Sequence, residues 1–301
     1  MEQGADVVNM SLGSSGASDG TDPMSLALND LSRRTGALFV VAAGNDGEQG
    51  PRTVGSPGAA DAALTVGAVD RNDSLAPFSS RGPRPGDEAV KPDVTAPGVG
   101  IVAARAAGTA MGTPVDEHYV AASGTSMATP HVAGAAALLA QRHPEWTAAR
   151  LKDSLISSAV TVDGQKVTEQ GGGRIDARAA VLGAVSATGT LALGPFTSEA
   201  TEPEASRVRY TNSSDKDVSL SLYADLATEG GRKPAEGSVR LGADSLKVPA
   251  NSSAEVLLTV DPARVGQGKF YGYVTAASSD GTVLAQTTVS VLVQGPTHRS
   301  P

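Results

Sequence analysis

The sequence predicts an α/β domain built on a parallel sheet, followed by an all-β sandwich domain. Up to about residue 188, short continuous apolar runs alternate with helical patterns in a part rich in Gly and Ala. This is typical of a parallel sheet with helices on both faces. After that point, short alternating or β-branched segments follow one another between turn signals, which indicates a sandwich. The aromatic residues divide in the same way, with four in the first 189 residues and six in the last 112.

Four apolar segments are the predicted strands of the first domain. Because they are apolar throughout rather than alternating, we expect them to be buried on both faces. The fourth contains Pro92, which cannot donate a hydrogen bond to a neighbouring strand. The segments are residues 6–12 (DVVNMSL), 38–43 (LFVVAA), 63–69 (ALTVGAV) and 91–96 (KPDVTA).

Helix signals stand between and after these strands. Asp22 and Pro23 form an N-cap followed by proline at the first helical position, and Gly36 fits the C-terminal end of that helix. Residues 127–141 are apolar nearly all round, which predicts a buried central helix. Two shorter helices are expected, one capped by Thr147 and one over residues 175–185.

The second domain is predicted from six short strands separated by turns. We expect an antiparallel arrangement, with domain limits at residues 1–188 and 189–295 and a loose polar tail at 296–301. The predicted strands cover residues 207–210, 218–223, 238–241, 254–260, 272–276 and 283–293.

Composition excludes several classes of protein. The 24 basic and 32 acidic residues give a net charge of −8, whereas nucleic-acid-binding proteins usually carry a basic patch. No apolar run reaches the roughly 18 residues of a membrane span, and residues 1–12 do not resemble a signal peptide. The absence of cysteine excludes disulfides, thiolate metal sites and a cysteine nucleophile.

The strongest chemical signal is Ser126, in the segment Gly124-Thr125-Ser126 where a loop enters the buried helix. A serine at a helix start is ordinarily a capping residue. Here the flanking glycine leaves space beside the hydroxyl, and the helix start offers unpaired N–H groups. That setting also suits a nucleophile whose carbonyl target becomes an oxyanion.

Asn45 is the second candidate. It follows Gly44 at the carboxyl end of a predicted buried strand, where ligands bind in open α/β sheets. An asparagine after glycine is ordinarily a turn residue. If Asn45 faces Ser126, its amide can donate to the same oxyanion as the Ser126 N–H.

Six segments together resemble the subtilisin-like serine peptidases, the subtilases, in the order and approximate spacing of that family. The resemblance covers about residues 1–186. The segments are 124–139 (GTSMATPHVAGAAALL), 40–45 (VVAAGN), 7–13 (VVNMSLG), 65–70 (TVGAVD), 78–82 (FSSRG) and 91–98 (KPDVTAPG).

The resemblance implies a role for each candidate. Ser126 would be the acylating nucleophile and Asn45 the oxyanion-hole side chain of an endopeptidase. Ser11, Leu12 and Gly13 would pair with the substrate backbone. The pocket for the residue before the cut would accept a large apolar side chain. The substrate-binding residues that remain are Ala42, Ala43, Gly44, Gly55, Gly124 and Thr125.

One departure from the family concerns the rest of the triad. Subtilases use Asp, His and Ser in chain order, in an Asp-Thr/Ser-Gly and a His-Gly-Thr-His segment, and this sequence contains neither. The chain therefore looks like the last two-thirds of the catalytic domain, incomplete at its N-terminus. Loss of the histidine alone lowers turnover about two-million-fold in subtilisin, so we expect the isolated chain to be inactive.

The four histidines do not fill this gap. We interpret His131 as a packed helix residue, His143 as a helix-end residue, His118 as a loop residue and His298 as part of the tail. The alternative function is a non-catalytic fragment or pseudoenzyme that serves as a binding or structural module.

The second domain resembles the fibronectin type III-like sandwiches of some large secreted bacterial subtilases, through residues 207–226 and 248–262. We expect a spacer or stabilising module. The alternative is that the aromatic residues of segment 270–273 (FYGY) are exposed and bind a polymer.

Expectations about cofactors, partners and cellular location rest on the family resemblance more than on individual residues. No cofactor or metal is assigned; calcium is common in subtilases, but the turn with Asp70, Asn72 and Asp73 is better explained as a solvated turn. The expected partner is a polypeptide substrate, and the resemblance implies secretion. The oligomeric state stays open.

Overall fold

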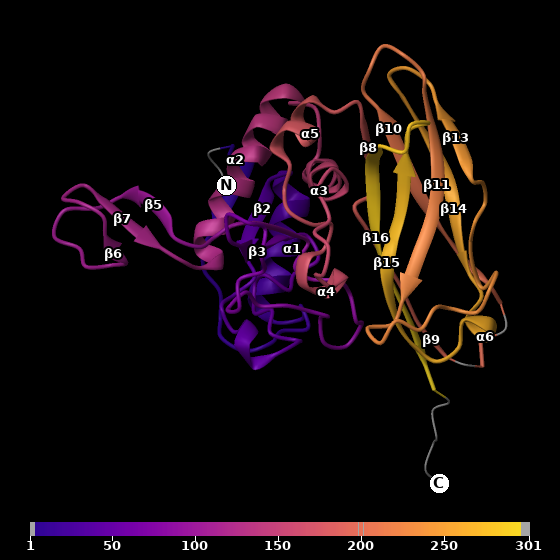
Figure 1. Ribbon diagram of the computed structural model, residues 1–301, viewed down its shortest axis with the longest axis horizontal. Helices are drawn as coiled ribbons and strands as arrows, with labels where there is room; N and C mark the ends of the chain where they lie inside the picture. The colour runs from indigo at the N-terminus through magenta and orange to yellow at the C-terminus, as the bar shows by residue number, and fades with distance from the viewer. Residues whose placement is uncertain (1–3, 198, 201, 296–301) are drawn as a thin grey trace, which may run out of the picture.

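The computed structural model describes residues 4–197, 199–200 and 202–295, which form two parts side by side (Figure 1). The N-terminal part combines a sheet with helices, and the C-terminal part consists mostly of long strands. The predicted tail at 296–301 lies outside the described residues. Within the described ranges, no helix has the length and apolar character needed to cross a membrane.

The N-terminal part is built on four parallel strands in the order β1-β2-β3-β4, which confirms the predicted parallel sheet. β2 and β3 are buried along their whole length, as their continuous apolar sequences predict. The strands are β1 (Val7–Met10), β2 (Leu38–Ala42), β3 (Leu64–Val69) and β4 (Val94–Pro97).

Helices cover both faces of this sheet because alternate strand residues point to opposite sides. Leu38 and Val40 of β2 pack in one cluster with α2 (Thr125–Arg142). Phe39 and Val41 pack in another cluster with Leu28 of α1 (Pro23–Thr35). The same strand therefore stabilises the packing of both helices.

The helix ends agree with their sequence signals. Asp22 accepts hydrogen bonds from the amides of Met24 and Ser25, and Gly36 ends α1 in the left-handed conformation with φ 74°. Thr147 caps α3 (Ala148–Ser157). The last predicted helix is shorter than expected, because Gly183 ends it and a strand follows. The short helices are η1 (Gly47–Gln49), α4 (Val167–Gln170) and α5 (Ala177–Leu182).

A three-stranded arm that the sequence did not predict projects from the N-terminal part (Figure 1). It consists of β5 (Ile101–Ala104), β6 (Thr113–Pro114) and β7 (Tyr119–Ala122), paired antiparallel in the order β5-β7-β6. Most of its side chains are exposed, including those of Val102, Met111 and Tyr119. Its short strands of small residues leave only a weak periodic signal.

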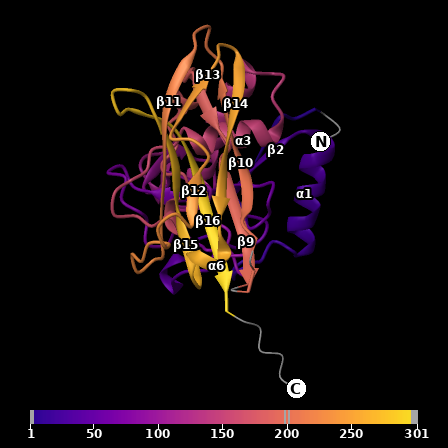
Figure 2. The same ribbon diagram turned by 90° about the vertical axis from the view of Figure 1, so that its right-hand side faces the viewer.

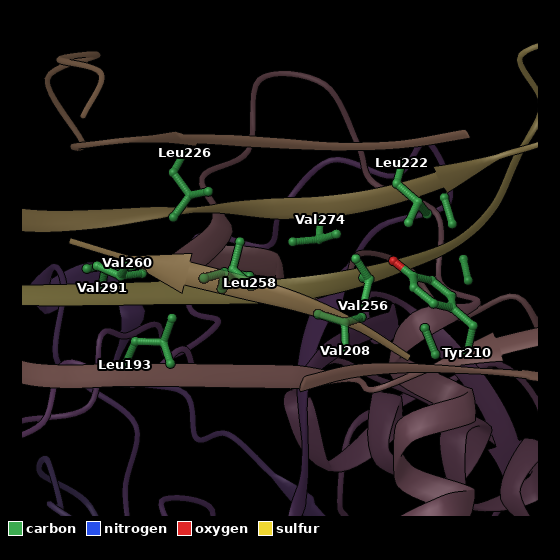
Figure 3. Packing of buried hydrophobic residues seen from close by; sticks show 14 of the residues in the cluster. Leu193, Val208, Tyr210, Leu222, Leu226, Val256, Leu258, Val260, Val274 and Val291 are labelled. Atoms are coloured by element: carbon green, nitrogen blue, oxygen red, sulfur yellow. The ribbon is translucent and has the colours of Figure 1, made fainter. Parts of the chain in front are cut away.

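The C-terminal part contains two sheets that share one buried cluster. Leu222 and Val274 of the five-stranded sheet meet Val208 and Leu258 of the four-stranded sheet (Figure 3). Figure 2 shows these strands in front of the N-terminal part. The four-stranded sheet has the order β12 (Val239–Leu241), β14 (Ser252–Val260), β10 (Glu204–Asn212), β8 (Val185–Ala187). The five-stranded sheet has the order β13 (Ser245–Val248), β11 (Val218–Ala227), β15 (Gly268–Ala277), β16 (Val283–Gln294), β9 (Thr190–Thr197), and α6 (Pro262–Val265) lies between β14 and β15.

One strand pairing differs from the predicted antiparallel arrangement, and one further strand extends the C-terminal sheets. β9 pairs with β16 in parallel; its sequence TLALGPFT contains a Gly-Pro turn signal, which hid the strand. β8 pairs with β10, so the C-terminal sheets begin at Val185, before the predicted limit of residue 189.

Polar side chains on the outer face of β15 and β16 join the two parts. The Tyr273 hydroxyl donates to the Gly171 carbonyl at 2.7 Å, and Gln286 Nε2 donates to the carbonyls of Ala159 and Gly172 at 3.1 and 2.6 Å. Lys269 Nζ lies 3.0 Å from Glu88 Oε1. These contacts explain why Gln286 is buried on a face that would otherwise meet water.

The same contacts overturn the predicted alternative of an exposed aromatic binding segment. Phe270 is fully buried in the C-terminal cluster. Tyr271 donates to Glu88 and Tyr273 to Gly171. Burial also raises the pKa of Tyr273. The rings therefore serve internal packing.

A buried ion pair stabilises the loops before β3 and β4. Lys91 Nζ donates to Asp93 Oδ2 at 2.8 Å, to Thr65 Oγ1 and to the carbonyls of Ala60 and Ala63. Burial lowers the pKa of Lys91 to about 7. Burial acts to raise the pKa of Asp93, but the ammonium groups of Lys152 and Lys91 hold it below its usual range. Four oxygen partners hold the Lys91 ammonium in place.

Tyr273→Phe should lower the free energy of unfolding by about 1 kcal/mol, because it leaves the Gly171 carbonyl without its donor. The urea midpoint of unfolding measures this change. Tyr223→Phe is the matched control, since Tyr223 is half exposed on β11 and should change stability by less than about 0.5 kcal/mol. Equal effects of the two substitutions would contradict a stabilising contact between the parts.

Lys91→Met should lower the free energy of unfolding by about 3–5 kcal/mol, because it leaves the buried Asp93 carboxylate without its closest cation. Thermal and urea unfolding measure the loss. Lys166→Met removes an exposed lysine that faces Glu229 at 3.5 Å and should cost less than about 1 kcal/mol. The double substitution Lys91→Met with Asp93→Leu should recover part of the loss; a double variant as unstable as the single one would be inconsistent with a charge effect.

Candidate active site

Ser126 lies in the first turn of α2, where the chain leaves the arm. Gly124 is the N-cap residue and has no side chain with which to cap this helix. Within the described part of the chain, the Ser126 N–H has no backbone or side-chain partner, as expected for the first amides of a helix. The Ser126 side chain is partly exposed. Ser126 thus offers both a hydroxyl and a free N–H at one point.

Asn45 follows the end of β2 and reaches this point from the sheet. The preceding Gly44 has φ 108°, and a Cβ there would lie 2.9 Å from Ser80 Oγ, so glycine allows the turn. Asn45 Oδ1 accepts hydrogen bonds from the Thr125 N–H at 2.9 Å and from Thr125 Oγ1 at 3.0 Å. The turn therefore directs the Asn45 carboxamide at the start of α2.

The bond from the Thr125 N–H determines the orientation of this carboxamide. A backbone amide can only donate, so the atom that faces it must be the oxygen of Asn45. Asn45 Nδ2 is then turned away and has no hydrogen-bond partner among the described residues. A Cβ at Gly124 would lie 3.6 Å from Nδ2. This donor therefore lies beside Gly124, two residues before Ser126.

Ser11, just beyond β1, makes reciprocal hydrogen bonds with Ser126. Ser126 Oγ donates to the Ser11 carbonyl at 3.1 Å, and Ser11 Oγ donates to the Ser126 carbonyl at 2.8 Å. Leu12 and Gly13 continue from Ser11 with exposed residues. The backbone of residues 11–13 therefore borders Ser126.

A groove of about 440 Å³ borders Ser126 on the other side. Asn45, Gly124, Ser126 and Met127 line it from the body of the domain. The arm supplies its remaining lining residues, which are Gly100, Met111, Gly112, Thr113, Ala121, Ala122 and Ser123. The sequence analysis missed these residues; their position directly before the serine segment was the only available signal.

Several predicted substrate-binding residues have buried side chains. Thr125 is fully buried; its hydroxyl donates to Asn45 Oδ1 and accepts from the Gly44 N–H, so this side chain positions Asn45. Ala42 and Ala43 are buried at the end of β2 and just after it. Gly55 is also buried, and a Cβ there would lie 2.2 Å from the Ser14 carbonyl. Gly44 and Gly124 lie next to Asn45, Gly44 in sequence and Gly124 in space.

No histidine in the described ranges contacts Ser126. His131 Nδ1 faces the Met127 carbonyl at 2.9 Å on the exposed side of α2. His143 stacks on Trp146 with ring centroids 4.0 Å apart, and His118 is exposed in the arm. His298 lies outside the described residues. The Ser126 hydroxyl therefore donates to a peptide carbonyl and not to an imidazole.

The carboxylates of the turn at Asp70, Asn72 and Asp73 are bound by other groups of the protein. Asp70 Oδ1 accepts from the amides of Asn72 and Ser74 at 2.8 and 2.9 Å, and Asp73 pairs with Arg174. In the residues that the structure describes, no group of three or more His, Cys, Asp or Glu side chains could hold a metal ion. These observations assign no metal to the turn.

Comparisons with known proteins agree with this geometry. The model of the subtilase family matches residues 1–179. Subtilisin amylosacchariticus of Bacillus subtilis subsp. amylosacchariticus is 43% identical over 155 residues, which are 51% of this chain and 35% of the relative. Subtilisin DY of Bacillus licheniformis is 37% identical over 162 residues, or 54% and 52% of the two chains. Alkaline elastase YaB of Bacillus sp. (strain YaB) is 37% identical over 177 residues, or 59% and 40%.

The matches thus span about a third to a half of the length of these relatives. The family model, in contrast, spans more than half of this chain and includes Asn45 and Ser126. The chain belongs to the subtilase family of serine peptidases.

Proposed function

We propose that this chain carries the nucleophile and the oxyanion hole of a serine endopeptidase. The observation that supports the proposal is the convergence of Asn45 and Ser126. Thr125 holds the Asn45 oxygen, so the Asn45 amide nitrogen is free beside the Ser126 N–H. Two free donors next to one hydroxyl are the arrangement that acyl transfer requires.

The reaction follows from these positions. Ser126 Oγ attacks the carbonyl carbon of the scissile peptide bond, and the carbonyl oxygen becomes an oxyanion. Asn45 Nδ2 and the Ser126 N–H donate to that oxyanion. The C–N bond then breaks, the amine leaves with a proton, and water hydrolyses the ester on Ser126.

No imidazole of the described residues contacts the Ser126 hydroxyl, so we propose that the general base is supplied by further polypeptide. Ser126 Oγ donates to the Ser11 carbonyl, and a peptide carbonyl is too weak a base to accept the proton. The sequence has neither the Asp-Thr/Ser-Gly nor the His-Gly-Thr-His segment. The same observation supports the second candidate function, a non-catalytic binding or structural module.

The acyl half of a polypeptide substrate would lie along Ser11, Leu12 and Gly13, whose backbone is exposed and adjacent to Ser126. We propose an apolar residue before the cut from the resemblance to the family alone, since Gly44 and Gly55 pack against Ser80 and the Ser14 carbonyl. As in secreted relatives of the family, we place the protein outside the cell. We assign no cofactor.

We propose that the C-terminal part is a fibronectin type III-like sandwich that stabilises the peptidase part. The shared cluster between its two sheets supports the sandwich arrangement. The contacts of Tyr273 and Gln286 with Gly171, Gly172 and Ala159 support the stabilising role.

A fluorophosphonate probe tests the nucleophile. The 301-residue chain should react negligibly and should not turn over a peptide ester, whereas a chain extended upstream to contain the Asp and His segments should be labelled and active. Ser126→Ala in the extended chain should abolish both, while Ser123→Ala, three residues earlier, should keep the label. Labelling that survives Ser126→Ala would refute the assignment, and an extended chain without any labelling would favour the non-catalytic module.

Asn45 and Thr125, which positions it, should behave differently in the extended, active chain. Asn45→Ala should lower kcat about 10²–10³-fold, the loss that removal of one such donor causes in subtilisin. Thr125→Val should lower kcat by about tenfold with little change in KM, because it removes one of the two bonds that orient Asn45, and Thr125→Ser should restore kcat. An unchanged kcat in Thr125→Val would show that the amide bond alone positions Asn45.

A further inference from the structure

We propose that the junction between the two parts carries a binding groove for an acidic polysaccharide. A hollow of about 540 Å³ lies between α3 of the N-terminal part and the outer face of the four-stranded sheet of the C-terminal part. Three arginines line it, Arg150 from α3 and Arg207 and Arg209 from β10. We call it the junction groove. Its concentration of arginines contrasts with the net charge of −8 of the chain.

Hydrogen bonds join α3 to β8 and the residues just after it, which lie side by side (Figure 1). Ser157 Oγ accepts from the Ala187 N–H at 3.0 Å, and Asp153 Oδ1 accepts from the Gly189 N–H at 2.8 Å. β8 in turn pairs with β10, which carries two of the arginines. Both parts of the chain therefore build the junction groove, and backbone contacts hold its walls together.

The two arginines of β10 keep donors available to a ligand. Arg207 and Arg209 are two residues apart on one strand, so their side chains leave the same face of the sheet about 7 Å apart. Glu255 of β14 accepts from Arg209 Nε at 2.9 Å and lies 3.4 Å from Arg207 Nε. One carboxylate is thus shared by two guanidinium groups, whose side chains are 75% and 64% exposed.

Arg150 has no carboxylate partner within hydrogen-bond distance in the part of the chain that the structure describes. Its guanidinium carbon lies 4.0 Å from the centre of the Trp146 ring. This stacking uses the flat face of the guanidinium group, so the N–H donors in its plane stay free. Burial lowers the pKa of Arg150, while Glu145 acts to raise it and Arg209 to lower it. An arginine remains charged even so, and the groove therefore holds a cation without a bound counter-charge.

The acidic side chains of this region are already engaged. Asp153 accepts the Gly189 N–H, and burial raises its pKa. Glu255 is shared by the two arginines of β10. Glu145 lies beyond the junction groove, 65% exposed and 3.6 Å from His143 Nδ1. The charge left over in the groove is positive, so it favours an anionic ligand.

The rest of the lining suits the hydroxyl groups of sugars. The junction groove continues into a second hollow of about 320 Å³, with which it shares Arg150, Thr211 and Ser253. Among the described residues that line the first hollow, no apolar side chain is larger than alanine. The groove therefore offers little apolar surface to a peptide side chain and many polar partners to a sugar. Side-chain hydroxyls and amides in the two hollows include those of Ser186, Thr188, Ser213, Asn251 and Ser252.

The chemistry of the lining favours a polysaccharide over a nucleic acid. Single-stranded nucleic acids bind through bases that stack on aromatic rings. Trp146 is already stacked on His143, with ring centroids 4.0 Å apart, and on Arg150. Guanidinium groups instead bind carboxylates through two parallel N–H bonds. A chain of sugars with repeated carboxylates can engage the three arginines in turn and place its hydroxyls on the Ser, Thr and Asn side chains.

Calorimetric titration of the 301-residue chain with tetragalacturonate tests the proposal, because this probe carries a carboxylate and hydroxyls on every sugar. It should bind saturably, and its affinity should fall as salt is raised, since salt screens exposed charges. Uncharged maltotetraose should bind at least tenfold more weakly. Tetraglutamate and tetrathymidylate carry the charge without the uronic acid sugars. Equal or tighter binding of either one would overturn the polysaccharide as the ligand class.

Arginine variants locate the site. Arg150→Gln and Arg207→Gln should each weaken tetragalacturonate binding about tenfold, because each removes charge-assisted hydrogen bonds. Arg240→Gln is the matched control, since Arg240 is exposed on β12 of the same sheet and does not line the groove. Equal losses in all three variants, or no saturable binding at millimolar probe, would overturn the proposal.

The outcome is separable from the proposed peptidase function. Ser126 does not line the junction groove, so Ser126→Ala should bind tetragalacturonate as tightly as the unaltered chain. A tenfold loss in that variant would locate the sugar at the candidate active site and refute the junction groove. Failure of fluorophosphonate labelling in the extended chain would refute the nucleophile without changing the expected titration.

Discussion

The hydrogen bond from the Thr125 N–H to Asn45 Oδ1 is the contact on which the candidate site depends. It connects the end of β2 to the start of α2 across 80 residues of sequence. Because the amide can only donate, it turns the Asn45 nitrogen outward. Asn45 is exposed, and without this bond its carboxamide would keep only the hydrogen bond from Thr125 Oγ1 to fix its orientation.

The packing of α2 against the sheet makes that bond possible. Val132 and Leu139 of α2 share a cluster with Leu38 and Val40 of β2, which holds the two elements in a constant relative position. Because residues 44 and 124 are glycines, the end of β2 and the start of α2 approach each other without a Cβ between them. The site is thus a product of core packing and of two residues without side chains.

A few polar contacts join the C-terminal part to the N-terminal part, which carries the candidate site. Gln286 and Tyr273 satisfy carbonyl groups of residues 159, 171 and 172, which are close in sequence to α3 and α4. Buried polar groups of this kind require their partners. The two parts therefore stabilise each other, and the Gly171 carbonyl occupies the Tyr273 hydroxyl.

The sequence by itself determined the parallel strands and the caps of α1 and α3, and it singled out Asn45 and Ser126 as candidates, because apolar runs, cap residues and short motifs are local signals. Only the tertiary structure decided that Thr125 holds Asn45, that β9 runs parallel to β16, and that the arm lines part of the groove. These features depend on contacts between distant residues, and the periodicity of a single segment carries no information about which other segment it meets.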